Sequence, residues 1–270
     1  MNSDFSLTAN QIEFLGATIK HAGSLLLKNY KNPKGIELKE DNTLVSTADK
    51  ESSSYIFQRL KSNFPSYGLI DEERKKSQNY LEKKYCWVID PLDGTREYLK
   101  NNTNFGIIIG LLHKNNPIFG MTYRPIPNEL IYAQKGKKAY EGSNKNKIGV
   151  KQSKEIDVLV TSSRMDEELK QILQKLSPKK ITSVGSSFKI IDVAQGKATL
   201  FIQPPGHTMH LWDLCGTSVI LHEAGGKITD WRGRPLSFFT DSFAHEGGII
   251  ASNGLIHERV VSLLSNVSRF

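Results

Sequence analysis

The chain has 270 residues, 38% of them hydrophobic, which is enough for one large domain or two small ones around an apolar core. No stretch approaches the ~20 apolar residues of a membrane span, and no basic segment precedes an apolar one at the N-terminus, so we expect neither a membrane helix nor a signal peptide. The net charge of +8 favours anionic partners, but the basic residues are scattered without interleaved aromatics, which argues against nucleic acid. The two cysteines are far apart in sequence, which suits a reducing cytoplasm better than a disulfide framework.

The first half of the chain reads as two helices followed by strands. Apolar residues at helical spacing over 12–26 predict a first helix that ends before Pro33. A Ser-x-x-Asp pattern at 46–49 resembles a capping box and predicts a second helix that continues to about Asn63. The segments with strand character that follow are 67–70, 85–89, 105–112, 118–123, 130–134 and 138–140. From residue 105 onward their close spacing predicts an antiparallel meander.

The second half alternates strands and helices, which is typical of an α/β layer. We expect strands at 158–160, 181–184, 199–202, 227–230 and 248–252, and helices at 166–176, 188–194, 213–224 and 256–264. The polar, turn-rich stretch 142–149 between the two halves is the expected boundary. It separates an α+β subdomain of residues 1–147 from an α/β subdomain of residues 148–270.

The hexapeptide Asp90-Pro91-Leu92-Asp93-Gly94-Thr95 is the most informative motif. The apolar run 85–89 before it predicts a buried strand, so both carboxylates are expected where this strand ends. Pro91 restricts the backbone and Gly94 permits a tight turn, which can direct two carboxylates and a main-chain carbonyl at one point. Mg²⁺ prefers such oxygen ligands. Asp-Pro and Asp-Gly are also common turn pairs, so the hexapeptide alone leaves a plain turn and a metal site equally open.

Further acidic residues fall at the ends of predicted elements, namely Asp49, Glu72-Glu73 and Asp213. Singly, each fits an ordinary role as a helix cap or an exposed loop charge. Together with the hexapeptide, with Trp212 before Asp213, and with Gly225-Gly226, they form an ordered pattern over most of the chain. The pattern resembles the lithium-sensitive, Mg²⁺-dependent phosphomonoesterase superfamily, which includes inositol monophosphatases and 3′(2′),5′-bisphosphate nucleotidases.

This resemblance implies a set of metal ligands. Glu72, Asp90 and the Leu92 carbonyl would hold one Mg²⁺. Asp90, Asp93 and Asp213 would hold a second, so that Asp90 bridges the two ions. Two such cations lower the pKa of bound water and stabilise the attacking and leaving oxygens of a phosphate ester.

The resemblance also implies a catalytic set of Asp49, Thr95 and Glu72, in which Thr95 and Asp49 orient the attacking water. Glu73 would support a third, weaker ion through water, and Mn²⁺ is an alternative to Mg²⁺. Asp49 could accept the Thr95 hydroxyl proton and leave the Thr95 oxygen free to accept from the water. Gly94 and Thr95 are expected to open a helix whose free amides suit a phosphate oxygen.

Two segments point to a subgroup of the superfamily. Arg96-Glu97-Tyr98 resembles the continuation of the motif in bacterial bisphosphate nucleotidases of the CysQ type. Residues 183–189 resemble the Gly-Ser-Ser-x-Lys motif of the same nucleotidases, which makes Ser186 and Lys189 expected substrate contacts, along with Asp213. A lysine there could bind a second phosphate as a point charge.

One segment departs from the nucleotidase pattern. Residues 161–166 lack the histidine that helps to hold the adenine in relatives. Arg164 in this segment could stack on a base instead, since a planar guanidinium does so readily. We interpret His207 and His210, which precede Trp212, as loop residues without a metal role.

We therefore expect a layered α/β/α/β/α sandwich of the inositol monophosphatase type, an enzyme that hydrolyses 3′-phosphoadenosine 5′-phosphate to AMP and phosphate. An inositol or sugar monophosphate phosphatase is the alternative within the superfamily, and a catalytically silent relative that binds nucleotide or RNA is the alternative outside it. The resemblance implies lithium sensitivity and a link to sulfur metabolism. We expect a cytoplasmic protein, with contact to the inner face of the membrane left open, as a monomer or a homodimer.

Overall fold

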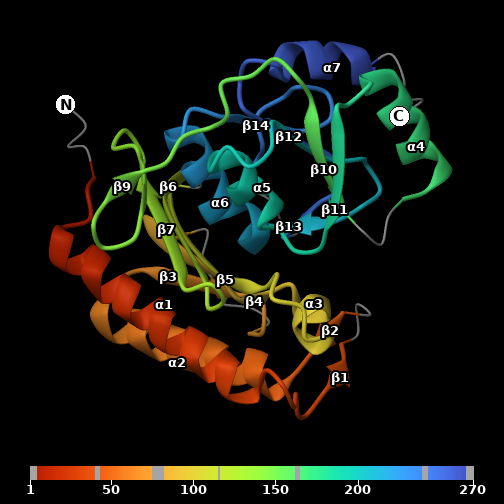
Figure 1. Cartoon of the computed structure of the whole chain (residues 1–270). Helices are drawn as coiled ribbons and strands as arrows, with labels where there is room; N and C mark the ends of the chain where they lie inside the picture. The colour runs from red at the N-terminus through yellow and green to blue at the C-terminus, as the bar shows by residue number, and fades with distance from the viewer. Residues whose placement is uncertain are drawn as a thin grey trace.

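Five alternating layers of helix and sheet build the molecule (Figure 1). The computed structural model describes residues 5–39, 43–74, 82–114, 116–161, 165–238 and 243–265. Helices α1 (Ala9–Asn29) and α2 (Thr47–Asn63) form the first layer and cover one face of a seven-stranded sheet. Helices α5 (Lys189–Ala194) and α6 (Leu211–Glu223) separate that sheet from a five-stranded one. The expected α/β/α/β/α sandwich is confirmed.

The seven-stranded sheet has the order β3-β4-β5-β6-β7-β8-β9. Its strands are β3 (Gly68–Asp71), β4 (Tyr85–Asp93), β5 (Gly106–His113), β6 (Asn116–Arg124), β7 (Glu129–Gln134), β8 (Ala139–Glu141) and β9 (Asn146–Lys147). β3 and β4 are parallel and the other pairs antiparallel, so the predicted meander is confirmed. The prediction that the strand ends before Asp90 is wrong, because β4 shifts register after Asp90 and pairs with β5 again at Asp93.

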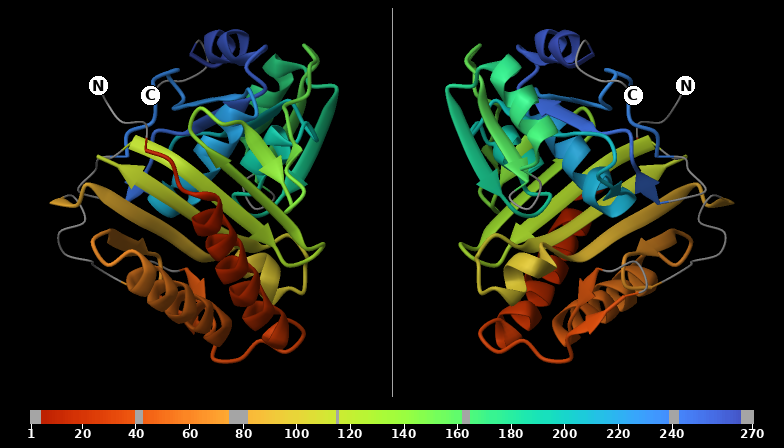
Figure 2. Two further views of the ribbon diagram at one scale, coloured as in Figure 1. Left: turned by 90° about the vertical axis from the view of Figure 1, so that its left-hand side faces the viewer. Right: turned by 90° about the vertical axis from the view of Figure 1, so that its right-hand side faces the viewer.

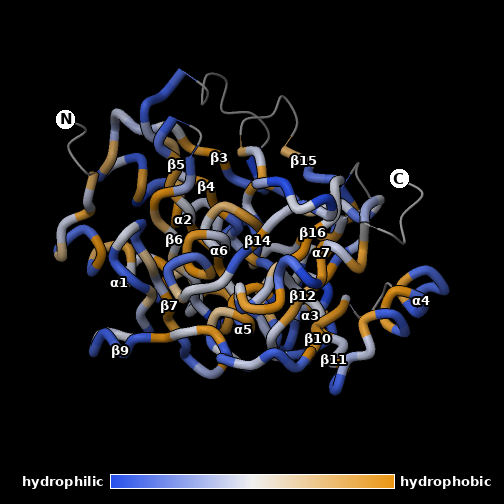
Figure 3. The backbone as a smooth tube through the Cα atoms, turned by 90° about the horizontal axis from the view of Figure 1, so that it is seen from above, coloured by the Kyte–Doolittle hydropathy of each residue, from blue (hydrophilic) through white to orange (hydrophobic). Residues whose placement is uncertain are grey.

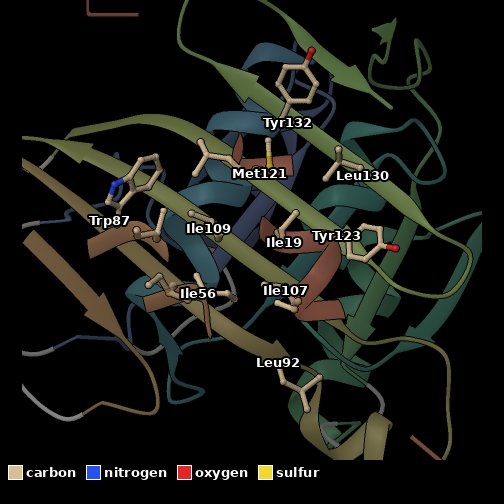
Figure 4. Close-up of a cluster of buried hydrophobic side chains, with 14 of the residues drawn as sticks. Ile19, Ile56, Trp87, Leu92, Ile107, Ile109, Met121, Tyr123, Leu130 and Tyr132 are labelled. Carbon is tan, nitrogen blue, oxygen red and sulfur yellow. The ribbon is translucent and has the colours of Figure 1, made fainter. Parts of the chain in front are cut away.

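Local sequence accounts for both helices of the first layer. Thr8 caps α1 with a reciprocal bond to Gln11, and Ser46 caps α2 in the same way with Asp49, as the sequence pattern predicts. The apolar faces of both helices pack on the sheet, where Ile19 and Ile56 are fully buried (Figure 4). Figure 2 shows the two helices on one side of the sheet and the middle layer on the other.

Helix α6 lies unusually close to the seven-stranded sheet. A Cβ atom at Gly120 on β6 would overlap the backbone of Gly216 on α6, and one at Gly110 on β5 would overlap Cys215. Glycine at these positions therefore permits the close approach. We expected this helix to begin at Asp213, which is wrong by two residues: His210 is the N-cap, and Asp213 is the third residue of the helix.

The five-stranded sheet has the order β11-β10-β12-β16-β14. Its strands are β10 (Asp157–Thr161), β11 (Lys180–Val184), β12 (Leu200–Gln203), β14 (Lys227–Thr229) and β16 (Ile249–Ser252). Helices α4 (Glu167–Leu176) and α7 (His257–Ser265) complete the fifth layer. In Figure 3, α4 alternates between hydrophobic and hydrophilic turns, as expected of a helix that covers a sheet on one face.

Short elements complete the fold around the edge of the sheets. They are the pairs β1 (Glu37–Leu38) with β2 (Leu44–Val45) and β13 (Met209–His210) with β15 (Ala244–His245), together with helix α3 (Thr95–Leu99). Within the described ranges, none of the helices combines the length and hydrophobicity that a membrane span requires. The division at residues 147 and 148 stays a prediction, since α6 from the second half packs on the sheet of the first half.

Candidate active site

Three carboxylates meet where the end of β4 approaches the start of α6. One oxygen from each of Asp90, Asp93 and Asp213 lies within 4.8 Å of the others. Asp90 and Asp93 are buried, with 1% and 6% of their surface exposed, and Asp213 is half-buried. In a regular strand, residues three apart point to opposite faces of the sheet. The register shift between Asp90 and Asp93 changes this alternation and brings both carboxylates to the same point.

Main-chain amides donate to all three of these carboxylates. The Leu92 amide donates to Asp90 Oδ1 at 3.1 Å. The Ser187 amide donates to both oxygens of Asp93, at 3.0 and 2.8 Å. For Asp213, the Ser187 hydroxyl donates to Oδ1 at 3.0 Å and the His210 amide to Oδ2 at 2.6 Å. Ser187 was not predicted from the sequence, although it stands next to Ser186 in the Gly-Ser-Ser motif.

The two glutamates that follow β3 share one lysine. The Lys39 ammonium lies 2.9 Å from Glu72 Oε1 and 2.6 Å from Glu73 Oε1. Burial alone would lower the pKa of Lys39, but the charges of both carboxylates outweigh it and raise that pKa above its usual range. Lys39 follows β1, and neither its strand pair nor its position near the acids was evident from the sequence. The carboxylates of Glu72 and Glu73 therefore attract a cation to this corner of the site.

Thr95 and Asp49 meet as the resemblance implies. The Thr95 hydroxyl lies 3.1 Å from Asp49 Oδ1 and 3.1 Å from the Leu92 carbonyl oxygen. The second oxygen of Asp49 accepts from the amide and the hydroxyl of Ser46 at 2.8 and 2.6 Å. Gly94, which precedes α3, has a φ of 84°, in the left-handed region that favours glycine. The cap of α2 thus fixes the carboxylate that receives the Thr95 hydroxyl.

Burial raises the pKa values of Glu72, Asp90 and Asp93. Burial, together with the charge of the neighbouring Asp213, raises the pKa of Glu72 to about 8 and the pKa of Asp93 to about 7. The pKa of Asp90 also lies well above its usual range because of burial and the charges of Glu72 and Asp93. Acids crowded in this way repel one another when ionised. A buried set of carboxylate oxygens fits hard divalent cations, which would offset that repulsion.

One cavity connects most of the residues implied by the resemblance. Those that line it are Glu72, Asp90, Leu92, Asp93, Gly94, Thr95, Ser186 and Asp213, and they share it with Arg96, Glu97, Thr161, Thr208, His210 and Trp212. Asp49 lies behind this lining and contacts it through Thr95. Glu73 lies behind it as well, and its carboxylate bonds to Lys39.

Lys189, a predicted substrate contact, is not among the residues that line the cavity. Lys189 is buried, with 3% of its surface exposed, and its ammonium donates to the carbonyls of Val184 and Ser186. Direct contact between Lys189 and the substrate stays a prediction. Arg164 lies outside the described residues.

His210 is not a loop residue, so that interpretation is wrong. His210 pairs with Ala244 of β15, and this pairing keeps the backbone of β13 extended up to the start of α6. His210 is therefore the N-cap of that helix. Its ring stacks on Trp212 with 4.7 Å between centroids and an interplanar angle of 6°. The stacked pair forms one wall of the cavity next to Asp213.

Known proteins are similar to this chain in sequence and in fold. A model of the inositol monophosphatase family matches residues 9–269. The chain is 32% identical over 234 residues to the 3′(2′),5′-bisphosphate nucleotidase CysQ of Escherichia coli, covering 84% of this chain and 94% of the relative. It is 28% identical over 254 residues to the inositol-1-monophosphatase of Bacillus subtilis, covering 90% and 91%.

Solved structures agree with the sequence relatives. An inositol monophosphatase from Anabaena matches with a TM-score of 0.76 at 27% identity, covering 97% of this chain and 98% of the other. The IMPase of Thermotoga maritima matches with a TM-score of 0.82 at 24% identity, covering 96% and 98%, and supports the fold. The chain therefore belongs to the inositol monophosphatase family and is a phosphatase of that superfamily.

Proposed function

We propose that the chain is a Mg²⁺-dependent phosphomonoesterase that hydrolyses 3′-phosphoadenosine 5′-phosphate to AMP and phosphate. The observation that carries the proposal is the convergence of Asp90, Asp93 and Asp213, whose ligand atoms lie within 4.8 Å of one another in a cavity. The nucleotide substrate is supported by the 32% identity to CysQ over most of both chains.

The acids divide into ligand groups in this proposal. Glu72, Asp90 and the Leu92 carbonyl would hold one cation, and Asp90, Asp93 and Asp213 a second. Bound cations supply Lewis-acid chemistry, since they lower the pKa of water and offset the negative charge of the phosphate. A third, weaker ion would lie near Glu73, where Lys39 now provides the positive charge.

The remaining residues orient the reactants. Thr95 donates to Asp49, so its oxygen keeps lone pairs with which to accept a hydrogen bond from the attacking water. Gly94 and Thr95 line the cavity and would contact the phosphate, and Ser186, which lies beside Gly94, would contact the substrate. Lys189 would support binding through its positive charge, which also acts on Asp93.

Inositol monophosphate hydrolysis is the second candidate, because the Bacillus subtilis inositol-1-monophosphatase aligns with 90% of this chain. The two are separated by phosphate release from 3′-phosphoadenosine 5′-phosphate and from inositol 1-phosphate, each with Mg²⁺ and with or without lithium. We expect kcat/KM to be at least about tenfold higher for the nucleotide, which corresponds to about 1.4 kcal/mol of transition-state binding. A preference for inositol 1-phosphate would replace the proposed substrate. Absence of Mg²⁺-dependent release from both would contradict the phosphatase proposal itself.

A further inference from the structure

We propose that Ser187 is a positioning residue that joins the two halves of the carboxylate cluster and sets its affinity for divalent cations. Its amide donates to both oxygens of Asp93, and its hydroxyl donates to Asp213 Oδ1 at 3.0 Å. Asp93 comes from β4 and Asp213 from α6, which are far apart in sequence. The inference rests on the proposed metal-dependent function, because it assigns Ser187 a role toward the ions that these acids would hold.

The turn before Ser187 is held in one conformation. Ser186 has a φ of 64°, in the left-handed region that a serine rarely adopts. The Gly185 carbonyl accepts from the Asn104 side-chain amide at 2.7 Å, and a Cβ atom at position 185 would overlap the Glu97 carboxylate. These contacts select a backbone path that directs the Ser187 amide at Asp93. A residue in a sparsely populated conformation persists only where its surroundings determine it.

Lys189 stabilises the same turn from the inside. Its ammonium donates to the carbonyl of Val184 at 3.3 Å and to that of Ser186, and it lies 5.1 Å from the centroid of the Phe201 ring. A buried ammonium is stable when carbonyl oxygens and an aromatic face replace its hydration. The conformation that presents Ser187 is thus supported by polar contacts on both sides.

The hydrogen bonds of Ser187 leave the carboxylates able to bind ions. An ionised carboxylate has about four lone-pair positions, and each oxygen of Asp213 accepts one bond, from Ser187 and from His210. Ser187 is 7% exposed, so water competes little for these bonds. Donors that orient the ligands of a metal site typically change its affinity by about 10- to 100-fold when they are removed. Ser187 would act in this way on two ligands at once.

The test is the binding of Mn²⁺, followed by calorimetry and by the loss of its free-ion electron paramagnetic resonance signal. Ser187→Ala keeps the amide and removes the hydroxyl, and we expect it to weaken binding by about 10-fold. Ser187→Thr returns a hydroxyl and should recover most of the affinity. Ser218→Ala is the matched control, because Ser218 is a buried serine on α6 whose hydroxyl donates to the Cys215 carbonyl, away from the acids.

Wild-type Mn²⁺ affinity in Ser187→Ala, or equal weakening in Ser218→Ala, would overturn the inference. In the phosphatase assay, Ser187→Ala should raise the Mg²⁺ concentration for half-maximal activity while kcat at saturating Mg²⁺ changes little. A loss of kcat that excess Mg²⁺ does not restore would also contradict a positioning role. If the wild-type chain itself binds no Mn²⁺, the proposed function fails, which is distinct from a failure of the role of Ser187.

Discussion

The hydroxyl of Thr95 and the carboxylate of Asp49 lie 3.1 Å apart, at the junction of α3 with the first turn of α2. The same hydroxyl lies 3.1 Å from the Leu92 carbonyl, one of the oxygens implied as a metal ligand. A threonine held between a carboxylate and the metal site is placed to orient a water molecule in the cavity. Both helix starts therefore contribute directly to the proposed chemistry.

Replacing this hydroxyl should slow catalysis without weakening substrate binding. We expect Thr95→Val to lower kcat by about 10²- to 10⁴-fold, the usual contribution of a positioned proton-transfer group, with a small effect on KM. Thr95→Ser keeps the hydroxyl and is the matched control, for which most of the activity should remain. Steady-state phosphate release checks both variants, and equal kcat values in Thr95→Val and the wild type would remove Thr95 from the mechanism.

The metal-free protein should lose stability as the pH rises. Folding raises the pKa of Asp93 to about 7 and that of Glu72 to about 8, chiefly through burial, so the folded state binds more protons than the unfolded state between about pH 4 and pH 8. Stability from these two groups is complete at low pH and is lost as the pH rises through their folded pKa values.

Divalent cations should reverse this loss, since they bind the ionised carboxylates and release protons. We expect the increase in Tm caused by Mg²⁺ to be larger at pH 8.5 than at pH 6.5, where protons compete with the ion. Calorimetric scans with EDTA and with Mg²⁺ at the two pH values measure this difference. An Mg²⁺ effect that is larger at pH 6.5 would contradict the location of the ions at these acids.

A buried histidine should make the second half of the chain sensitive to acid. His257 is fully buried, and its ring nitrogens lie 3.0 Å from Thr229 Oγ1 and 2.8 Å from Ser252 Oγ. Burial, with the charges of Lys227 and His222 and against the opposing charge of Glu258, lowers the pKa of His257 to about 4. Because the folded pKa is below the unfolded value, stability from this group is lost as the pH falls from about 6.5 to about 4.

His257→Leu should remove that acid sensitivity. We expect it to cost about 1–3 kcal/mol at pH 7.5, because two buried hydroxyls each lose one of their hydrogen-bond partners. Its further loss of stability between pH 6.5 and pH 4.5 should be smaller than in the wild type. Urea unfolding at the three pH values tests this, and an identical acid-induced loss in both proteins would show that His257 is not the group responsible.

The close contact between α6 and the sheet should respond to one methyl group. A Cβ at Gly120 would overlap the Gly216 backbone, which has no flexible side chain to move. We expect Gly120→Ala to destabilise the fold by at least about 1–3 kcal/mol and to weaken Mn²⁺ binding, because α6 carries Asp213. Gly149→Ala is the control, since its Cβ would lie 3.7 Å from the nearest atom, an ordinary contact. Equal stability of the two variants in urea would contradict the tight packing of α6.

Much of this fold and site was predictable because the signals are local. The alternation of strands and helices in the second half and the cap at Ser46 follow from periodicity and capping chemistry, and the structure confirms both. The order of the acidic residues predicted the cluster of Asp90, Asp93 and Asp213, because two of them belong to the hexapeptide and the third lies in the first turn of α6.

The features that the sequence analysis missed depend on contacts between distant segments. The two-residue strands, including the one that precedes Lys39, are too short to show any periodicity. The role of Ser187 follows from the left-handed backbone of Ser186, which no residue type at that position indicates. His210 was assigned to a loop because its strand partner, β15, lies more than thirty residues later in the chain.

The most direct test of the account is phosphate release by Asp90→Asn. Asp90 is the only residue proposed to contact both ions, and an asparagine oxygen can still accept from the Leu92 amide, so the fold should remain intact. Asp230→Asn is the control, because Asp230 is also a buried aspartate and lies in a turn of the other half of the chain.

We expect Asp90→Asn to lose on the order of 10³-fold or more of kcat with Mg²⁺ and 3′-phosphoadenosine 5′-phosphate, while its Tm without metal stays at or above that of the wild type. Asp230→Asn should retain its activity where it remains folded. Phosphate release by Asp90→Asn at near the wild-type rate would contradict the metal-dependent mechanism.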